Sequence, residues 1–239
     1  MDFWIRTIPS VLEEDEKTGW NVYMLFRGSS RLLKSLSCHV AVISEGKIPH
    51  PLHQHPEEEL ILVSSGEVDN IMVEGDLSHI ERTNRLRKGV LIYLPDHHPH
   101  TLRAIGPGPA TLLVFKWEGH SREKKDGLLD GVIIDPSEGR GRSDSSFKNG
   151  SRITRLFETP TNYLQKLSVR IAELEPGAGF GWHRDRYDLA IAMLSGPMDT
   201  MGVKLRDPAA LFVTAGTPHW MRNPGEGATS FLVLEFHKD

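Results

Sequence analysis

Three histidines and one glutamate in the first half of the chain have the residue types and the spacing of a metal site. His53 and His55 lie two residues apart, so on an extended strand both side chains point to the same face. Glu59 keeps that parity on the strand-like run that follows, and His100 comes after a second run, residues 90–95. Neutral imidazole nitrogens and a carboxylate oxygen are good donors for a divalent transition metal. If the two runs pair across a barrel, these four side chains converge on one ion.

A plainer interpretation exists, because a His-x-His pair on a strand is often a pair of ordinary surface histidines. The correctly spaced Glu59 and His100 favour the metal site over that alternative. The neighbouring Glu57 and Glu58 are interpreted as a solvated acidic loop, although either could replace Glu59 if the register of the strand shifted by one residue.

Three other histidines, His50, His97 and His98, are expected in loops at the mouth of the barrel. An imidazole titrates near neutral pH and can act as a general base or contact a substrate. We select His50 and His98 as the candidate catalytic residues. No residue is assigned to an organic cofactor.

In order and spacing, the residues resemble the two sequence motifs of the cupin superfamily. The first motif is carried by Gly46, His53, His55, Glu59 and Gly66, and the second by Gly89, Pro95, His97 and His100. His97 stands where glycine is usual, in a tight turn that favours positive φ, which histidine tolerates better than most residues. The resemblance implies a small β-barrel with a metal ion inside.

Length and composition set the frame for these motifs. The chain has 239 residues, enough for one large or two small domains, and 38% hydrophobic and 25% charged residues indicate a soluble globular protein. A net charge of -4 gives no sign of the basic surface of nucleic-acid-binding proteins. The acidic N-terminal region has no long apolar run, so we expect no membrane contact and a cytoplasmic location. The single cysteine, Cys38, is expected in the core.

The second half of the chain repeats the first. Leu33, Leu36, Ser37, Ala41 and Gly46 are echoed, at one constant offset, by Leu164, Leu167, Ser168, Ala172 and Gly177. The chain therefore resembles a bicupin, and we predict an all-β fold of two tandem cupin barrels (double-stranded β-helix or jelly roll). The expected boundaries are an N-terminal barrel at residues 1–118, a linker or surface loop at 119–150, and a C-terminal barrel at 151–239.

The two predicted barrels differ in chemistry. His183 and His219 occupy two ligand positions of the second barrel, Asp185 replaces the second histidine, and Leu189 stands where the glutamate should be. Three ligands could still hold a metal, as in two-His-one-carboxylate sites. Because an aliphatic side chain fills the fourth position, we interpret this barrel as structural or as an apolar ligand pocket. Asp188 lies next to the empty position, but its parity directs it to the other face.

A three-His, one-Glu site leaves coordination positions open, as catalytic metal sites do. The resemblance implies chemistry of the kind found in dioxygenases, decarboxylases, isomerases and lyases that act on small oxygen-rich molecules, and the fold does not select among them. We predict a metal-dependent enzyme, dioxygenase-like in the first place, with one divalent transition metal (Fe, Mn, Ni, Cu or Zn) and a small-molecule substrate.

The alternatives are a non-enzymatic bicupin that binds a small ligand, and an isomerase or lyase acting on a sugar-like substrate. A homodimer is a further expectation, since an N-terminal edge strand would suit pairing between two copies.

Overall fold

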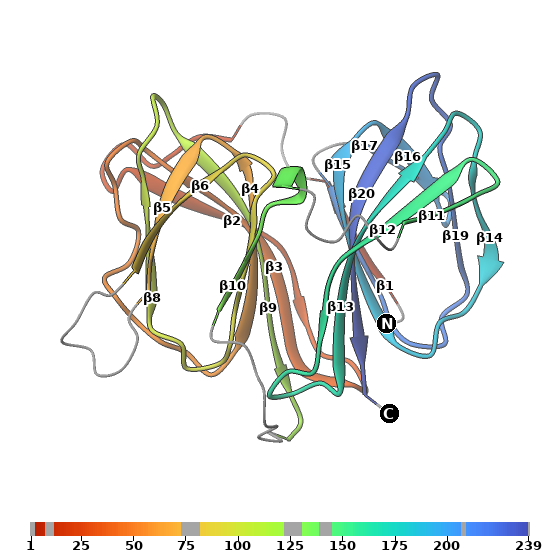
Figure 1. Ribbon diagram of the computed structural model, residues 1–239, viewed down its shortest axis with the longest axis horizontal. Coiled ribbons are helices and arrows are strands. Elements are labelled where there is room, and N and C mark those ends of the chain that lie inside the picture. Colours follow the sequence, from red (N-terminus) through yellow and green to blue (C-terminus); the bar gives the residue numbers. More distant parts are fainter. Residues whose placement is uncertain are drawn as a thin grey trace.

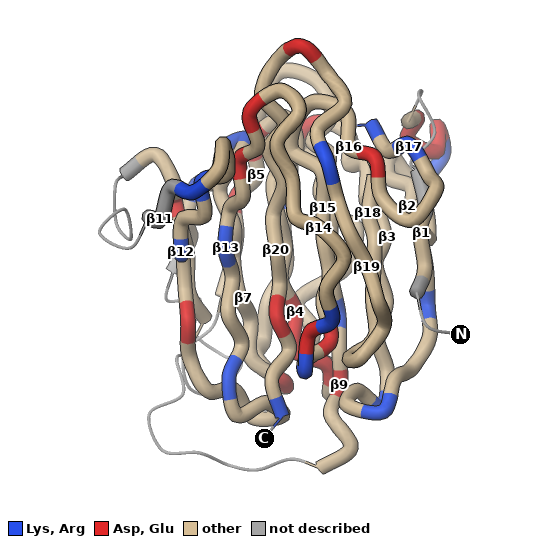
Figure 2. Tube along the Cα trace, turned by 90° about the vertical axis from the view of Figure 1, so that its right-hand side faces the viewer, with Lys and Arg blue, Asp and Glu red and all other residues tan. Residues whose placement is uncertain are grey.

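The computed structural model describes residues 3–7, 12–72, 82–121, 131–138, 145–206 and 209–238. Apart from one short 3-10 helix, Pro136–Glu138, the regular structure of these residues consists of β-strands. The predicted all-β, two-barrel fold is confirmed, and Figure 1 shows the barrels side by side. No helix in the described part of the chain has the length and apolar character needed to cross a membrane. Basic and acidic positions are interspersed along the trace in Figure 2.

Each barrel combines a large and a small antiparallel sheet. The six-stranded sheet of the first barrel has the order β10 (Val132–Ile134), β7 (Leu91–Leu94), β4 (Glu58–Ser65), β9 (Ala110–Gly119), β3 (Leu33–Ile43), β2 (Trp20–Gly28). Its small sheet has the order β6 (Arg82–Arg87), β5 (Glu67–Met72), β8 (His100–Ala104).

The second barrel is built in the same way. Its seven-stranded sheet has the order β1 (Phe3–Thr7), β18 (Ala209–Val213), β15 (Asp188–Ser195), β20 (Thr229–His237), β13 (Lys166–Leu174), β12 (Ser151–Thr159), β11 (Ser145–Lys148). Its small sheet has the order β14 (Gly179–His183), β19 (His219–Arg222), β16 (Pro197–Thr200), β17 (Val203–Arg206).

Two strands depart from the predicted boundaries. β1, which we assigned with residues 1–118 to the first barrel, pairs with β18 of the second, and β10, inside the predicted linker 119–150, pairs with β7 of the first. β1 pairs with backbone N–H and C=O groups at the edge of the second barrel's large sheet, and β10 does the same for the first barrel. Without these strands, those groups would lack a partner strand. Residues 122–130 and 139–144 of the predicted linker lie outside the described residues.

The two large sheets share one hydrophobic core. Their facing side chains form a single buried cluster, in which the rings of Trp117 and Phe236 lie 5.3 Å apart and those of Phe26 and Phe212 lie 6.1 Å apart. Two further clusters fill the interiors of the barrels. Burying a large apolar side chain contributes about 1.5–3 kcal/mol. The sheets at the interface are therefore buried on both faces, and the barrels pack against each other through one continuous core.

Glu58 begins β4 and lies between the barrels, so our prediction of a solvated acidic position is wrong: this residue is 0% exposed. It faces opposite to Glu59 because successive side chains alternate along a strand. One carboxylate oxygen accepts a hydrogen bond from Trp117 Nε1 at 2.6 Å, and the other accepts one from the Asn162 backbone N–H at 2.8 Å. Burial raises the pKa of Glu58 to about 7.

Asp188 begins β15 in the second barrel and takes the equivalent place, as its parity predicted. It is 1% exposed, and its carboxylate accepts hydrogen bonds from the Ser30 hydroxyl and, at 2.8 Å, from the Ala215 backbone N–H. Ser30 Oγ in turn accepts the backbone N–H groups of Leu32 and Leu33. Each barrel thus places one buried carboxylate against a loop that precedes a strand of the other barrel.

We predict that the Glu58→Gln substitution removes a pH dependence of stability. The pKa of Glu58 is raised in the folded state, so its contribution is fully present below about pH 4.5 and is lost as the pH rises through about 7. The metal-free wild type should lose on the order of 3 kcal/mol over this interval relative to the variant. Urea unfolding at pH 4.5 and pH 8 measures the difference, with Glu45→Gln as the exposed control. Equal pH profiles for wild type and Glu58→Gln would contradict the prediction.

Candidate metal centre

The structure brings the four predicted ligands of the first barrel together. His53 and His100 are joined by a β-bridge, with backbone N···O distances of 3.2 and 3.0 Å. Nitrogen atoms of His53, His55 and His100 lie within 4.8 Å of one another. Glu59, only 4% exposed, places Oε2 3.0 Å from His100 Nε2 and 3.4 Å from His55 Nε2.

Backbone carbonyls orient the three imidazole rings. The Nδ1 atoms of His53, His55 and His100 lie 3.1, 3.0 and 2.8 Å from the carbonyl oxygens of Pro51, Glu57 and His98, in that order. A carbonyl oxygen only accepts, so each Nδ1 donates its proton to one, and in the neutral form of each ring Nε2 then keeps a lone pair. Bonds of this kind orient histidine ligands in metal sites.

These lone pairs and the carboxylate of Glu59 favour a positively charged partner, and the Lys116 ammonium group supplies part of that charge. In two of the rings Nε2 lies close to Glu59 Oε2, which is buried. Lone pairs that face a buried carboxylate repel each other unless a proton or a cation lies between them. Three nitrogen donors and one carboxylate oxygen suit a divalent transition metal, so the residues present fit such an ion.

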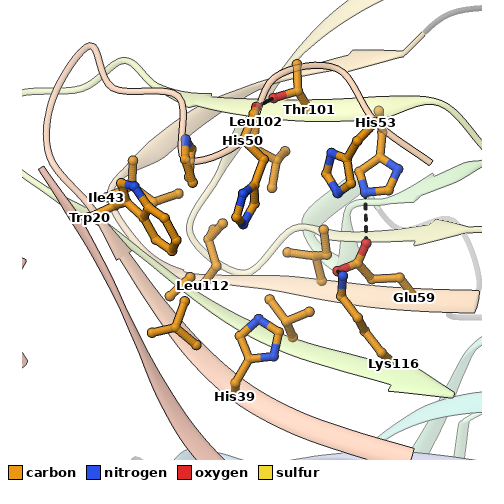
Figure 3. Close-up of a pocket in the computed structure, with 16 residues that line it drawn as sticks. Trp20, His39, Ile43, His50, His53, Glu59, Thr101, Leu102, Leu112 and Lys116 are labelled. Carbon is orange, nitrogen blue, oxygen red and sulfur yellow. Dashed lines mark hydrogen bonds and ion pairs between the residues drawn. The ribbon is translucent and has the colours of Figure 1, made fainter. Parts of the chain in front are cut away.

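The ligand set opens on a small cavity of about 80 Å³. Its walls are mostly apolar, and His39, His50, Thr101 and Lys116 supply polar groups beside the predicted ligands (Figure 3). One water molecule needs roughly 10–15 Å³ of such volume, so the cavity has room for a molecule of only a few heavy atoms beside a bound ion.

Sequence reasoning missed two residues that face this cavity. His39 on β3 is largely buried. Burial is the main cause that lowers its pKa to about 4, so its imidazole is neutral at pH 7. Lys116 on β9 places Nζ 3.0 Å from His55 Nε2 and 3.3 Å from Glu59 Oε1. The available signal was strand parity: Cys38 and Val40 face the shared core, so His39 between them faces the barrel interior.

Of the two candidate catalytic histidines, the structure places one at the cavity. His50 lines this cavity, and its ring lies 5.4 Å from that of His53. Burial is the main cause that lowers the pKa of His50. His98 is not among the residues that line this cavity, so its catalytic role stays a prediction. Its carbonyl oxygen lies 2.8 Å from His100 Nδ1. His97 has φ 56°, which turns the chain as expected of a residue in the glycine position.

The second barrel holds a similar cluster of three residues. Donor atoms of His183, Asp185 and His219 lie within 4.8 Å of one another, and Asp185 Oδ2 lies 3.3 Å from His219 Nε2. The Nδ1 atoms of the two histidines again face backbone carbonyls, at 2.7 and 3.0 Å. Leu189, at the position that corresponds to Glu59, lines a cavity of the second barrel beside these three residues. We interpreted this barrel as structural or as an apolar pocket, but the described residues bring together a set of ligands that could hold a metal.

Comparison with known proteins agrees with the fold. Residues 39–116 match the family model of the cupin domain, and no curated protein sequence matches the chain. A deletion variant of Bacillus subtilis oxalate decarboxylase is similar with a TM-score of 0.67 and 14% identity, over 98% of this chain and 77% of that one. A second structure of oxalate decarboxylase, described by its substrate binding mode and a reaction specificity switch, has a TM-score of 0.68 and 15% identity. That match covers 99% of this chain and 77% of the other. The match to the cupin domain thus lies within the first barrel, and nearly the whole chain shares the fold of oxalate decarboxylase.

We predict that His53→Ala and His183→Ala have different effects on bound metal. The first cluster has four ligands, whereas the second has three, and the His183 side chain is 39% exposed. After washing with a mild chelator, the wild type should keep about one equivalent of transition metal per chain, which His53→Ala should lose and His183→Ala should retain. Elemental mass spectrometry gives the metal content, and circular dichroism controls for folding. Equal losses in the two variants would contradict this difference between the barrels.

Proposed function

We propose that this bicupin is a metal-dependent enzyme that acts on a small oxygen-rich molecule in the cavity of the first barrel. The observation that carries the proposal is the convergence of histidine Nε2 lone pairs on the buried carboxylate of Glu59, beside a cavity. A closed structural site would bury its ligands without such a cavity, whereas catalytic sites keep a position open.

A divalent transition metal held by His53, His55, Glu59 and His100 would polarise a substrate oxygen and, if it were redox-active, support reaction with dioxygen. The chain supplies the rest of the environment. Apolar side chains exclude water from most of the wall, and the backbone bonds to the imidazole rings hold the ligands in place before an ion binds.

Two neutral imidazoles complete the site on the side away from Glu59. His39 and His50 point into the cavity in Figure 3. Each can donate one hydrogen bond to a substrate oxygen or accept one from a substrate hydroxyl. They therefore orient a substrate relative to the ligands and can hold a proton beside it.

A dioxygen-dependent reaction is our leading candidate, because a set of three histidines and one carboxylate suits redox-active metals. A decarboxylation or another lyase reaction is the second candidate. The observation that favours it is the similarity in fold to oxalate decarboxylase, an enzyme named for a small carboxylic acid. Both candidates place a compact, oxygen-rich substrate in the first cavity.

The test is a substrate screen of the metal-loaded protein with small hydroxy, oxo and dicarboxylic acids and with diketones. We expect turnover of at least one class, accompanied by oxygen consumption at an electrode. Glu59→Gln should reduce that turnover by at least about 100-fold, because the variant removes a charged ligand. Lys34→Met, at the surface, serves as the control.

The outcomes separate the candidates. Turnover that continues without oxygen and releases carbon dioxide would replace the dioxygenase with the decarboxylase. Ligand-induced thermal stabilisation without any turnover would contradict the enzyme and favour a module that only binds a small ligand.

A further inference from the structure

Lys116 is a charged side chain inside a barrel. It lies on β9 directly opposite Glu59 on β4, and its side chain is 24% exposed. Among the described residues that line the first cavity, it is the one lysine or arginine. Figure 3 shows its amino group at Glu59, on the side of the cavity where the histidine ligands lie.

The partners of Lys116 are themselves candidate metal ligands. Its ammonium group donates to His55 Nε2 at 3.0 Å and pairs with Glu59 Oε1 at 3.3 Å. An imidazole nitrogen has one lone pair, so a metal ion on His55 Nε2 would remove that acceptor from Lys116. An ammonium group has three N–H donors, and a half-buried donor without an acceptor is unfavourable. In the loaded site, Lys116 would therefore have N–H groups available for a ligand in the cavity.

The charge of the loaded site favours an anion. A divalent ion together with the Lys116 ammonium group exceeds the single negative charge of Glu59, while His39 is neutral at pH 7. The excess positive charge would lie in a cavity with mostly apolar walls, where electrostatic interactions are stronger than in water. A carboxylate next to the ion would balance this charge and accept the released N–H groups.

The second barrel provides an internal comparison. Its strand pair has Leu189 opposite Glu235 where the first barrel has Glu59 opposite Lys116. Glu235 is paired with Arg170 at 3.2 Å. The position equivalent to Lys116 therefore carries a carboxylate. The cationic side chain of the second cavity, Arg170, comes from another strand and is paired with that carboxylate and not with a candidate metal ligand. Only in the first cavity does the cationic side chain contact candidate ligands, among the described lining residues.

We propose that Lys116 binds the carboxylate of the substrate and makes the first cavity selective for small organic acids. The apolar wall, formed in part by Trp20, Ile43 and Leu112, contacts a short hydrocarbon portion of the same molecule. This inference rests on the proposed metal-dependent function and names its substrate class. Lys116 acts as a specificity-determining residue in addition to the four ligands.

The experiment uses cobalt(II)-loaded full-length protein, whose visible absorption changes when a ligand approaches the ion. Propanoate is the probe, and propanamide is the neutral control of the same shape. Lys116→Met should keep about one cobalt per chain and should bind propanoate at least about tenfold more weakly than the wild type, with unchanged affinity for propanamide. Lys116→Arg should retain part of the propanoate affinity. Lys34→Met, at an exposed pair with Glu118, should match the wild type.

Each result supports or overturns the inference. Selective loss of propanoate affinity in Lys116→Met supports it. Equal propanoate affinity in the cobalt-loaded variant and the wild type would overturn the role of Lys116 and leave the metal-dependent function intact. Loss of cobalt from Lys116→Met, with the fold retained, would overturn it by showing that the ammonium group serves the ligand set. Absence of cobalt binding in the wild type would overturn both the proposed function and this inference.

Discussion

The packing of the two large sheets against each other determines the position of everything else in the molecule. Trp117, Phe115, Phe212 and Phe236 belong to one buried cluster, so the outer face of each large sheet is as apolar as its inner face. In β4 this double burial fixes the register. Glu58 faces the second barrel and Glu59 faces the cavity, and a shift of one residue would exchange the two carboxylates. The contact between the barrels thus fixes the register of β4 and, with it, the position of the candidate ligand Glu59.

The local part of the metal centre could be predicted from sequence. Strand parity placed His53, His55 and Glu59 on one face, and the motif added His100 across the barrel. These relations depend on short spacings and on a resemblance that covers both motifs. The positive φ of His97 also followed, because its position in the turn leaves few other conformations.

The parts that escaped prediction depend on contacts between distant segments. Lys116 reaches the site because β9 pairs with β4, and Glu58 is buried because its partners are Trp117 and Asn162. Composition near Glu58 is that of a surface loop, and tertiary contacts overrode it. In the second barrel, the loss of the glutamate suggested an empty site, but the positions of His183, Asp185 and His219 follow from the barrel and not from the missing ligand. The two halves share one barrel architecture and differ in the residues at the ligand positions.

The exchange of β1 and β10 between the barrels has a consequence for the independence of the two halves. β1 precedes the strands of the first barrel and β10 precedes those of the second, and each extends the large sheet of the other barrel. A single repeat expressed alone would keep an open sheet edge and an uncovered apolar face, which two identical copies could cover by swapping their leading strands around a two-fold axis. In the present chain both halves belong to one polypeptide, so each edge is covered within the same molecule and the two halves need not be identical. One cavity therefore carries four candidate ligands, while the other has Leu189 in place of the glutamate.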